Sequence, residues 1–472
     1  MIKKILKYKK KIFIFNSLTQ KKENFIPIIN NNINMYICGP TLNNNIHLGN
    51  YRTFIFFDVI YRYFKHLKFN VKYIRNITDI SNLKKLKNKH PLEDMQKFLL
   101  NFYFNFKKFN ILSPNIEPRT TSHIIEQIEN IKKIIKKKYA YIKNGSIYFD
   151  ILNYTKKIGN YGNILNNINI NNVKLINNNF LNDKKNYYDF AIWKKANNNT
   201  MKWNSPWGIG YPGWHLGCST MSNKYLGNYF DIHGGGLDLK FPHHECEISQ
   251  CNVINNNKYN LAKFWIHTNM LIINNKKMSK SLNNYIIPDD IINGKLNFLN
   301  YKKINPIIIK LYFLKTHYRK VINFTKKSLI EVKNDYKYLL SFFKKIKKVT
   351  PKKKSSINYE KICNNCYEYI NDDFNIPLLI YNLFKINKLI EKCIINELQI
   401  TLEDLNKINF FMKTFIIKIL GLKKVKKKLN YNKLFKKIFK IRNDMRKKKI
   451  YFFSDKLRKI LNKFFIIKDN KI

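Results

Sequence analysis

The sequence lacks a long apolar run, and this absence argues against a helix that spans a membrane. Residues 12–15 are apolar and follow a lysine-rich stretch, but four residues are too few for the core of a signal peptide. A disulfide framework is not indicated either, because the seven cysteines are an odd number spread over 472 residues without secretory features. We therefore expect a cytoplasmic protein with reduced thiols.

Acidic residues are scarce, since 30 Asp and Glu stand against 88 Lys and Arg, for a formal net charge of +58. Such a charge favours a polyanionic partner, because lysines near phosphates release counterions on binding. An AT-rich coding sequence would produce the same excess, together with the asparagine runs at 30–32, 43–45, 177–179 and 255–257. Charge alone leaves two interpretations open, RNA binding and mutational drift on a solvated surface.

Cys363 and Cys366 have the spacing of a redox or zinc pair. No second pair follows them, so two incidental cysteines in a helix are the preferred interpretation. The chain is long enough for several domains and a large core.

Local patterns predict a parallel strand, helix and strand near the N-terminus. Residues 34–37 read as a short buried strand that Gly39-Pro40 stops, residues 47–66 have the apolar spacing of a helix packed on a sheet, and residues 71–77 form the next strand. This order predicts a parallel βαβ unit. His47 then lies at a helix N-terminus, where phosphate binding is favoured.

Four side chains of the zinc-binding type are spread through the chain, namely Cys38, Cys218, His243 and Glu247. Pro242 suits the first turn of a helix, so His243 and Glu247, four residues apart, share one face. Imidazole and carboxylate are usual zinc ligands, and two distant cysteines would complete a tetrahedron. Cys246 lies three residues from His243 and could also reach the metal, so spacing alone cannot choose between Cys246 and Glu247.

Two short motifs give these residues a context. Lys277-Met278-Ser279-Lys280-Ser281 matches the signature loop of class I aminoacyl-tRNA synthetases, and His47-Leu48-Gly49-Asn50 resembles their other signature with two substitutions. Further matching segments lie at 35–41, 75–79, 212–219 and 231–247. In this order and at these separations, the sequence resembles the cysteinyl-tRNA synthetase family from about residue 15 to about residue 469.

The resemblance implies an α/β fold in which a Rossmann-type class I catalytic domain, split by an inserted connective domain, is followed by a C-terminal helical bundle. The insertion is asparagine-rich and expected to be irregular, with one helical segment near 123–138. The expected divisions are a catalytic domain in two halves at 1–116 and 206–270, a connective insertion at 117–205, a signature-loop and stem-contact region at 271–330, a helical bundle at 331–425, and a small anticodon-side segment at 426–472.

The resemblance also implies a reaction, the ATP-dependent activation of L-cysteine to cysteinyl-AMP and its transfer to the terminal adenosine of tRNA(Cys). One Zn²⁺ per chain would be held by Cys38, Cys218, His243 and Glu247, Mg²⁺ would accompany ATP, and a monomer is expected. Catalysis is expected from His47, Asn50, Lys277 and Lys280. Contacts with ATP are expected from His47, Gly49, Asn50, His233, Gly234, Gly235 and Lys280, and contacts with the amino acid from Thr78, Trp214 and His233.

Zinc would solve a selection problem that pocket shape cannot. Serine differs from cysteine by one atom, and a hydrophobic pocket rejects such near-isosteres by only about 100-fold. Zinc prefers a thiolate strongly over a neutral hydroxyl, so no editing domain is expected. Asn50, Gly217 and Asn283 depart from the family's usual residues. Asparagine can still donate a hydrogen bond to phosphate or ribose, so activity is expected.

Two other functions stay open at this point. One is a cysteine ligase that couples activated cysteine to an amino sugar, but such paralogues lack the extended C-terminal region that follows His317 here. The other is a catalytically decayed relative kept only to bind RNA. The intact set of zinc-type ligands and signature lysines argues against it, because a binding protein needs neither.

Overall fold

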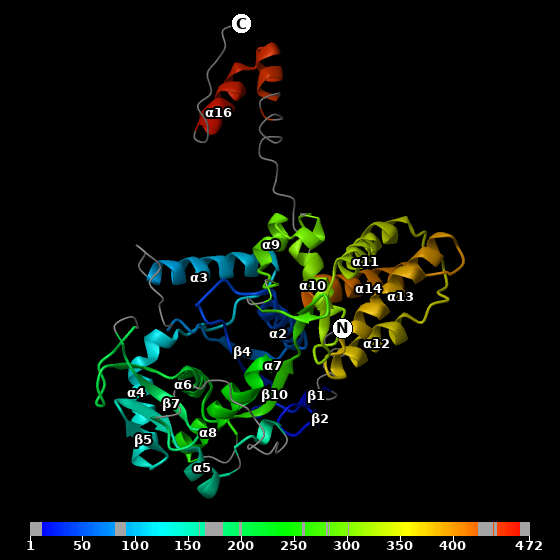
Figure 1. Cartoon of the computed structure of the whole chain (residues 1–472). Helices are drawn as coiled ribbons and strands as arrows, with labels where there is room; N and C mark the ends of the chain where they lie inside the picture. The colour runs from blue at the N-terminus through cyan, green and yellow to red at the C-terminus, as the bar shows by residue number, and fades with distance from the viewer. Residues whose placement is uncertain are drawn as a thin grey trace. The chain divides into compact units, whose positions relative to one another are not determined.

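The computed structural model consists of two compact units, Met1–Lys423 and Lys424–Ile472 (Figure 1). The residues it describes are 12–80, 91–159, 161–165, 183–197, 201–256, 260–279, 282, 284–300, 302–422, 438 and 441–462. Within those ranges, no helix combines the length and the apolar character that crossing a bilayer requires.

A four-stranded parallel sheet in the order β10-β9-β3-β4 forms the centre of the first unit. β3 (Asn32–Ile37) and β4 (Asn70–Arg75) are joined through α2 (Leu48–His66), which confirms the predicted strand, helix and strand. β9 (Phe230–Gly236) and β10 (Ala262–Thr268) come from much later in the chain and add to the sheet in parallel. All four carboxyl ends therefore lie along one edge, where α/β folds bind ligands.

Helix α2 is buried over most of its surface, because aromatic and aliphatic residues fill nearly every turn. Its buried charges have partners, as charges removed from water require. Asp58 accepts hydrogen bonds from Arg62 Nε (2.9 Å) and Lys310 Nζ (2.7 Å). Arg52 donates to the carbonyl of Asn269 (2.7 Å), just after β10. The contact of Arg52 holds the start of α2 beside the ligand-binding edge of the sheet.

The insertion is more regular than its asparagine-rich sequence indicates. α4 (Ile124–Lys136) is the predicted helix, but the expectation of irregular chain around it was wrong. A four-stranded antiparallel sheet lies there, made of β5 (Ala140–Lys143), β6 (Ser146–Phe149), β7 (Phe190–Lys195) and β8 (Gly210–Pro212). β8 lies beyond residue 205, where the insertion was expected to end, and it pairs with β7.

This sheet carried one local signal that the sequence analysis overlooked. Asn144 and Gly145 join β5 to β6, and both have positive φ values, 50° and 78°. An Asn-Gly pair with this backbone makes the two-residue turn that suits the twist of a hairpin.

Helices dominate the rest of the first unit, as expected for the helical bundle at 331–425. In Figure 1 the yellow and orange helices of this part lie side by side. α13 (Ile376–Ile394) begins after Asn375, which caps it by accepting a hydrogen bond from Leu378 N (3.3 Å). Cys363 and Cys366 lie in a helix as expected, and all seven cysteines are free. The helices are α9 (Pro288–Asn293), α10 (Pro306–Leu314), α11 (Lys326–Lys345), α12 (Tyr359–Asn371), α13 (Ile376–Ile394) and α14 (Leu402–Lys413).

The remaining elements are short or flank the sheets. A three-stranded sheet in the order β12-β11-β13 contains β11 (Leu271–Ile273), β12 (Lys276–Lys277) and β13 (Ile322–Phe324). The other strands and α-helices that the structure describes in the first unit are β1 (Phe13–Asn16), β2 (Lys21–Asn24), α3 (Pro91–Lys108), α5 (Ile151–Lys157), α6 (Trp214–Leu226), α7 (Leu237–Leu239) and α8 (Glu245–Asn255). The second unit contains α16 (Tyr451–Asn462).

Candidate active site

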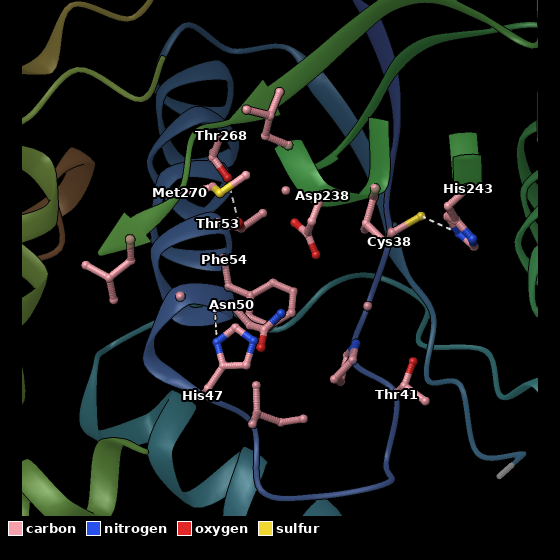
Figure 2. A pocket seen from close by; sticks show the side chains of 18 of the residues that line it. Cys38, Thr41, His47, Asn50, Thr53, Phe54, Asp238, His243, Thr268 and Met270 are labelled. Atoms are coloured by element: carbon pink, nitrogen blue, oxygen red, sulfur yellow. Dashed lines mark hydrogen bonds between the residues drawn. The ribbon is translucent and has the colours of Figure 1, made fainter. Parts of the chain in front are cut away.

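A cavity of about 390 Å³ lies at the carboxyl edge of the parallel sheet. Residues that follow each of the four strands line it, namely Cys38 after β3, Thr78 after β4, Leu237 after β9 and Asn269 after β10. Figure 2 shows His47 and Asn50 at the start of α2, with Cys38 and His243 to their right. The cavity therefore joins the helix N-terminus predicted to bind phosphate to three of the predicted metal ligands, Cys38, Cys218 and His243.

The four predicted metal ligands lie together at one end of this cavity. The ligand atoms of Cys38, Cys218, His243 and Glu247 are all within 4.8 Å of one another. Cys38 Sγ lies 3.8 Å from Cys218 Sγ, 3.6 Å from His243 Nε2 and 3.5 Å from Glu247 Oε1. At most 5% of any of these residues is exposed. Two thiols, an imidazole and a carboxylate can hold a metal ion.

The electrostatics of the cluster favour the anionic forms of Cys218 and Glu247, whereas burial and the hydrogen bond to Cys218 raise the pKa of the Cys38 thiol. The hydrogen bond from Cys38 lowers the pKa of the Cys218 thiol to about 6. Burial acts to raise the pKa of Glu247, but the neighbouring His233 and His243 outweigh it and lower that pKa to about 2. A carboxylate and a thiolate that are both buried need a positive partner. Burial acts to lower the pKa of His243, but Glu247 and Cys218 outweigh it and raise that pKa to about 10, so the imidazolium of His243 is that partner.

His243 reaches the cluster as the sequence predicted. Phe241 is the one residue of η6 (Lys240–His244) with an extended backbone (φ −141°, ψ 137°), so helical backbone starts at Pro242 and continues through His244 (φ −67°, ψ −33°) into α8. His243 Nε2 lies 3.0 Å from Glu247 Oε1. The two side chains predicted to share a helix face therefore do meet.

Cys246, the alternative to Glu247 in the spacing argument, is directed elsewhere. Its Sγ lies 3.2 Å from the hydroxyl of Tyr161, within the apolar cluster that includes residues of the insertion. Two groups of the described residues could hold a metal ion, and neither contains Cys246 whereas both contain Glu247. Successive residues of a helix differ in direction by about 100°, which separates the two side chains.

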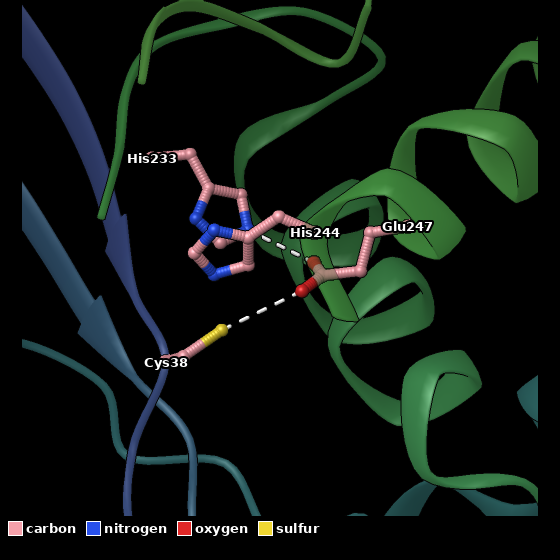
Figure 3. Close-up of side chains that lie close together, drawn as sticks. All are labelled: Cys38, His233, His244 and Glu247. Atoms are coloured by element: carbon pink, nitrogen blue, oxygen red, sulfur yellow. Dashed lines mark hydrogen bonds and ion pairs between the residues drawn. The ribbon is translucent and has the colours of Figure 1, made fainter. Parts of the chain in front are cut away.

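Two further histidines lie on the other side of Glu247. Figure 3 shows Cys38, His233, His244 and Glu247, whose ligand atoms also lie within 4.8 Å of one another. His233 Nε2 is 2.9 Å from Glu247 Oε2, and His244 Nδ1 is 2.8 Å from His267 Nε2. His233 therefore engages the carboxylate oxygen that faces away from His243, which orients Glu247.

His215 is a functional candidate that the sequence analysis missed. Its Nδ1 lies 2.9 Å from Nδ1 of His243, so the ring nitrogen of His243 opposite the cluster is engaged. Partners of this kind set the orientation of a ligating imidazole. Both His215 and Cys218 belong to α6, and their spacing of three residues could have placed them on the same side of that helix.

Two residues expected to contact the amino-acid substrate lie near the metal-type cluster, the name used here for Cys38, Cys218, His243 and Glu247. Trp214 lines the cavity, and its ring centroid is 4.5 Å from that of His243. Thr78 also lines it, and its Oγ1 accepts a hydrogen bond from Asn76 Nδ2 (3.1 Å). Asn76 Oδ1 in turn accepts from the N–H of Gly39 (2.8 Å). A side chain at Gly39 would lie 1.6 Å from the Asn76 carbonyl, so this close approach requires glycine.

His47, Gly49, Asn50 and Lys277 line the other end of the cavity. The N–H of Asn50 donates to His47 Nδ1 (3.3 Å), so the neutral ring carries its proton on Nε2. Burial lowers the pKa of His47, which favours that neutral form. Lys280, Ser281 and Asn283 lie outside the described residues.

Three residues expected to contact substrate do not line the cavity. His233 is fully buried behind Glu247, and Gly234 and Gly235 lie within β9. A side chain at Gly234 would lie 2.1 Å from Phe57 of α2, so this glycine allows helix and sheet to pack closely. Asp238, to which the sequence analysis gave no role, does line the cavity and shows its carboxylate there in Figure 2.

Comparison with known proteins agrees with this geometry. Residues 24–334 match the family described as tRNA synthetases class I (C) catalytic domain. The curated cysteine–tRNA ligase of Azobacteroides pseudotrichonymphae genomovar. CFP2 is 40% identical, over 98% of this chain and 98% of that protein. The cysteine–tRNA ligase of Bacteroides thetaiotaomicron is 37% identical over 97% of each.

Solved structures of other synthetases share the fold. A leucyl enzyme of Agrobacterium radiobacter K84, in a ternary complex with tRNA, has a TM-score of 0.57 at 10% identity, covering 83% of this chain and 84% of its own. Methionyl-tRNA synthetase of Mycobacterium tuberculosis bound by methionyl-adenylate has a TM-score of 0.53 at 12% identity, covering 85% and 86%. With the near full-length curated relatives, these likenesses lead to one conclusion: the chain belongs to the class I aminoacyl-tRNA synthetases and, among them, to the cysteine–tRNA ligase family.

Proposed function

We propose that this chain activates L-cysteine with ATP to give cysteinyl-AMP and then transfers the cysteine to the terminal adenosine of tRNA(Cys). One observation carries the proposal. A single cavity has a cluster of metal-type ligands at one end and both signature segments at the other. Curated relatives named cysteine–tRNA ligase that cover 97–98% of the chain support it over an amino-sugar ligase or a decayed RNA-binding protein.

We infer that Cys38, Cys218, His243 and Glu247 hold one Zn²⁺. The donor set suits zinc, which takes thiolate sulfur, imidazole nitrogen and carboxylate oxygen. When bound, zinc would supply a strong preference for a thiolate over a hydroxyl, and so for cysteine over serine. His215 and His233 hold the outer atoms of His243 and Glu247 and keep both ligands oriented.

The other residues of this end bind the amino acid. Trp214 forms a wall beside His243, and Thr78 presents a hydroxyl whose direction Asn76 fixes. The cysteine carboxylate is then directed toward the end of the cavity that contains His47.

Activation forms a bond between a carboxylate oxygen of cysteine and the α-phosphorus of ATP, and breaks the bond from that phosphorus to the leaving pyrophosphate. His47 donates from Nε2–H to the phosphate oxygens as charge develops on them. Gly49 and Asn50 bring the N-terminus of α2 close to the same oxygens, and Lys277 and Lys280 neutralise the pyrophosphate. Mg²⁺ with ATP would share that charge. Asp238, an acceptor, suits the ribose hydroxyls.

Cysteine-dependent exchange of pyrophosphate into ATP by the purified chain tests the proposal. Exchange with cysteine but not with serine, and charging of tRNA(Cys) when that tRNA is added, are the expected results. Exchange without any charging of tRNA would favour the amino-sugar ligase. Absence of both would leave only RNA binding. We further propose that the enzyme is a monomer and works in the cytoplasm, which size measurement and fractionation can check.

Glu247 and Cys246 make a matched pair for testing the fourth ligand. Glu247→Ala should lower zinc retention by at least about 10-fold, because it removes a ligand atom together with the oxygen that His233 holds. Cys246→Ala should keep the metal, since that thiol contacts Tyr161 instead. Zinc content after dialysis against a chelator measures both. Metal loss in Cys246→Ala alone would contradict the assignment.

The second unit offers a test of RNA binding. Replacing the exposed Arg446, Lys447 and Lys448 by glutamine should raise KM for tRNA(Cys). The slope of the logarithm of the tRNA-binding constant against the logarithm of salt concentration should become shallower by about one per lost phosphate contact. Pyrophosphate exchange should stay unchanged, because the cavity is built within the first unit alone.

The matched control neutralises the three exposed lysines at 352–354 in the first unit. Equal increases of KM in both variants would indicate general charge rather than a surface of the second unit. Equal loss in charging and exchange would mean that Arg446 to Lys448 stabilise the fold.

A further inference from the structure

We infer that Tyr285 is a positioning residue that couples the second signature segment to His47. This inference rests on the proposed function, in which His47 contacts the phosphates of ATP. Tyr285 is half-buried, follows the signature Lys277 to Ser281, and lines the cavity beside His47. Its ring meets the imidazole edge to face, with centroids 5.3 Å apart and planes at 78°.

The hydroxyl of Tyr285 makes a second link, to the loop that precedes His47. It donates to the carbonyl of Asn45 at 2.9 Å. The side chain of Asn45 accepts from Asn101 Nδ2 of α3 (3.1 Å), and Asn101 accepts from Asn105 Nδ2 (2.7 Å). The loop at 43–45 is therefore held from two sides. Composition alone attributes this asparagine run to drift, but Asn45 has a defined place beside the cavity.

The neighbours of Tyr285 connect the same two segments. Asn284 Oδ1 accepts from the N–H of Ser279 (2.8 Å), and its Nδ2 donates to the carbonyl of Lys277 (3.0 Å). The carbonyl of Ile286 accepts from the N–H of Leu48 (2.9 Å). Three consecutive residues thus bind the signature backbone, the His47 ring with its loop, and the first residue of α2.

This arrangement determines where the proton of His47 points. The hydrogen bond from Asn50 engages Nδ1, and the Tyr285 ring limits rotation of the imidazole away from that bond. Nε2–H is left directed toward the position proposed for the phosphates. A catalytic group misplaced by about 1 Å can cost on the order of 100-fold in rate, so a lost packing partner should be measurable.

The test is a double-mutant cycle of Tyr285→Leu and His47→Asn, with pyrophosphate exchange as the readout. Tyr285→Leu alone should lower kcat by about 10-fold and change KM for cysteine by less than about twofold, since only the phosphate end is disturbed. In the His47→Asn background it should have almost no further effect, because residues that act as a unit are not additive. Tyr285→Phe keeps the ring and should restore most of the activity.

Several outcomes decide the inference. An equal loss from Tyr285→Leu in both backgrounds, or no loss in either, overturns the coupling. If the leucine variant fails to fold, Tyr285→Phe carries the same cycle, with an expected loss of about threefold that disappears beside His47→Asn. Tyr312→Phe is the control, because it removes a hydroxyl bond to the carbonyl of Asn323 away from the cavity and should leave exchange unchanged. A wild-type chain without cysteine-dependent exchange counts against the proposed function instead.

Discussion

Replacing Cys218 by serine is expected to remove the bound metal and to lower cysteine-dependent pyrophosphate exchange by more than about 100-fold. Replacing a residue that only orients a metal ligand typically lowers metal affinity or activity by about 10- to 100-fold. The expected loss is larger here because Cys218 is itself a proposed ligand. Cys218 is 2% exposed and lies 3.8 Å from Cys38 Sγ. A serine hydroxyl is a poor zinc ligand, so a site with this change keeps too few donors.

Elemental analysis of zinc per chain, made alongside the exchange assay, measures this effect. Cys251→Ser is the matched control, because that thiol is equally buried nearby but contacts the Ser219 carbonyl at 3.8 Å and belongs to neither metal-binding group. It should keep both metal and activity. A Cys218→Ser variant that retains one zinc per chain would exclude Cys218 as a ligand.

Replacing His47 by asparagine should lower the rate of adenylate formation by about 100-fold, because it removes a donor to the phosphate oxygens that strengthens as charge develops. Asparagine is among the best N-cap residues, so α2 should keep its cap and the protein its stability. The metal-type cluster lies at the other end of the cavity. Zinc content and cysteine affinity should therefore not change.

Single-turnover formation of cysteinyl-AMP, with a thermal melt of each variant, separates chemistry from folding. Thr325→Asn is the control, because Thr325 caps α11 through its side chain and lies away from the cavity. It should leave the rate unchanged. Unchanged adenylate formation in His47→Asn would remove His47 from the mechanism, and a lower Tm with a parallel loss of metal would make its role structural.

Local periodicity was enough to predict β3, α2 and β4, because helices and strands leave their repeats on neighbouring residues. It failed for the antiparallel sheet of the insertion. The strands there have three to six residues, and Ile147 pairs with Trp193 across a long stretch of chain. Strands this short carry little alternation, so only the turn at Asn144 and Gly145 marked the sheet in the sequence.

The sequence by itself determined the chemistry of the candidate site, since the donor types, the signature segments and their order all follow from it. Only the tertiary structure decided which donors meet. It turned Glu247 and not Cys246 toward Cys38, and it added His215, His233 and Tyr285 as neighbours of functional side chains. Cys38 and Cys218 are 180 residues apart in the chain but 3.8 Å apart in space. That proximity arises because β3 pairs with β9 and α6 packs beside β3, and no local pattern encodes such long-range packing.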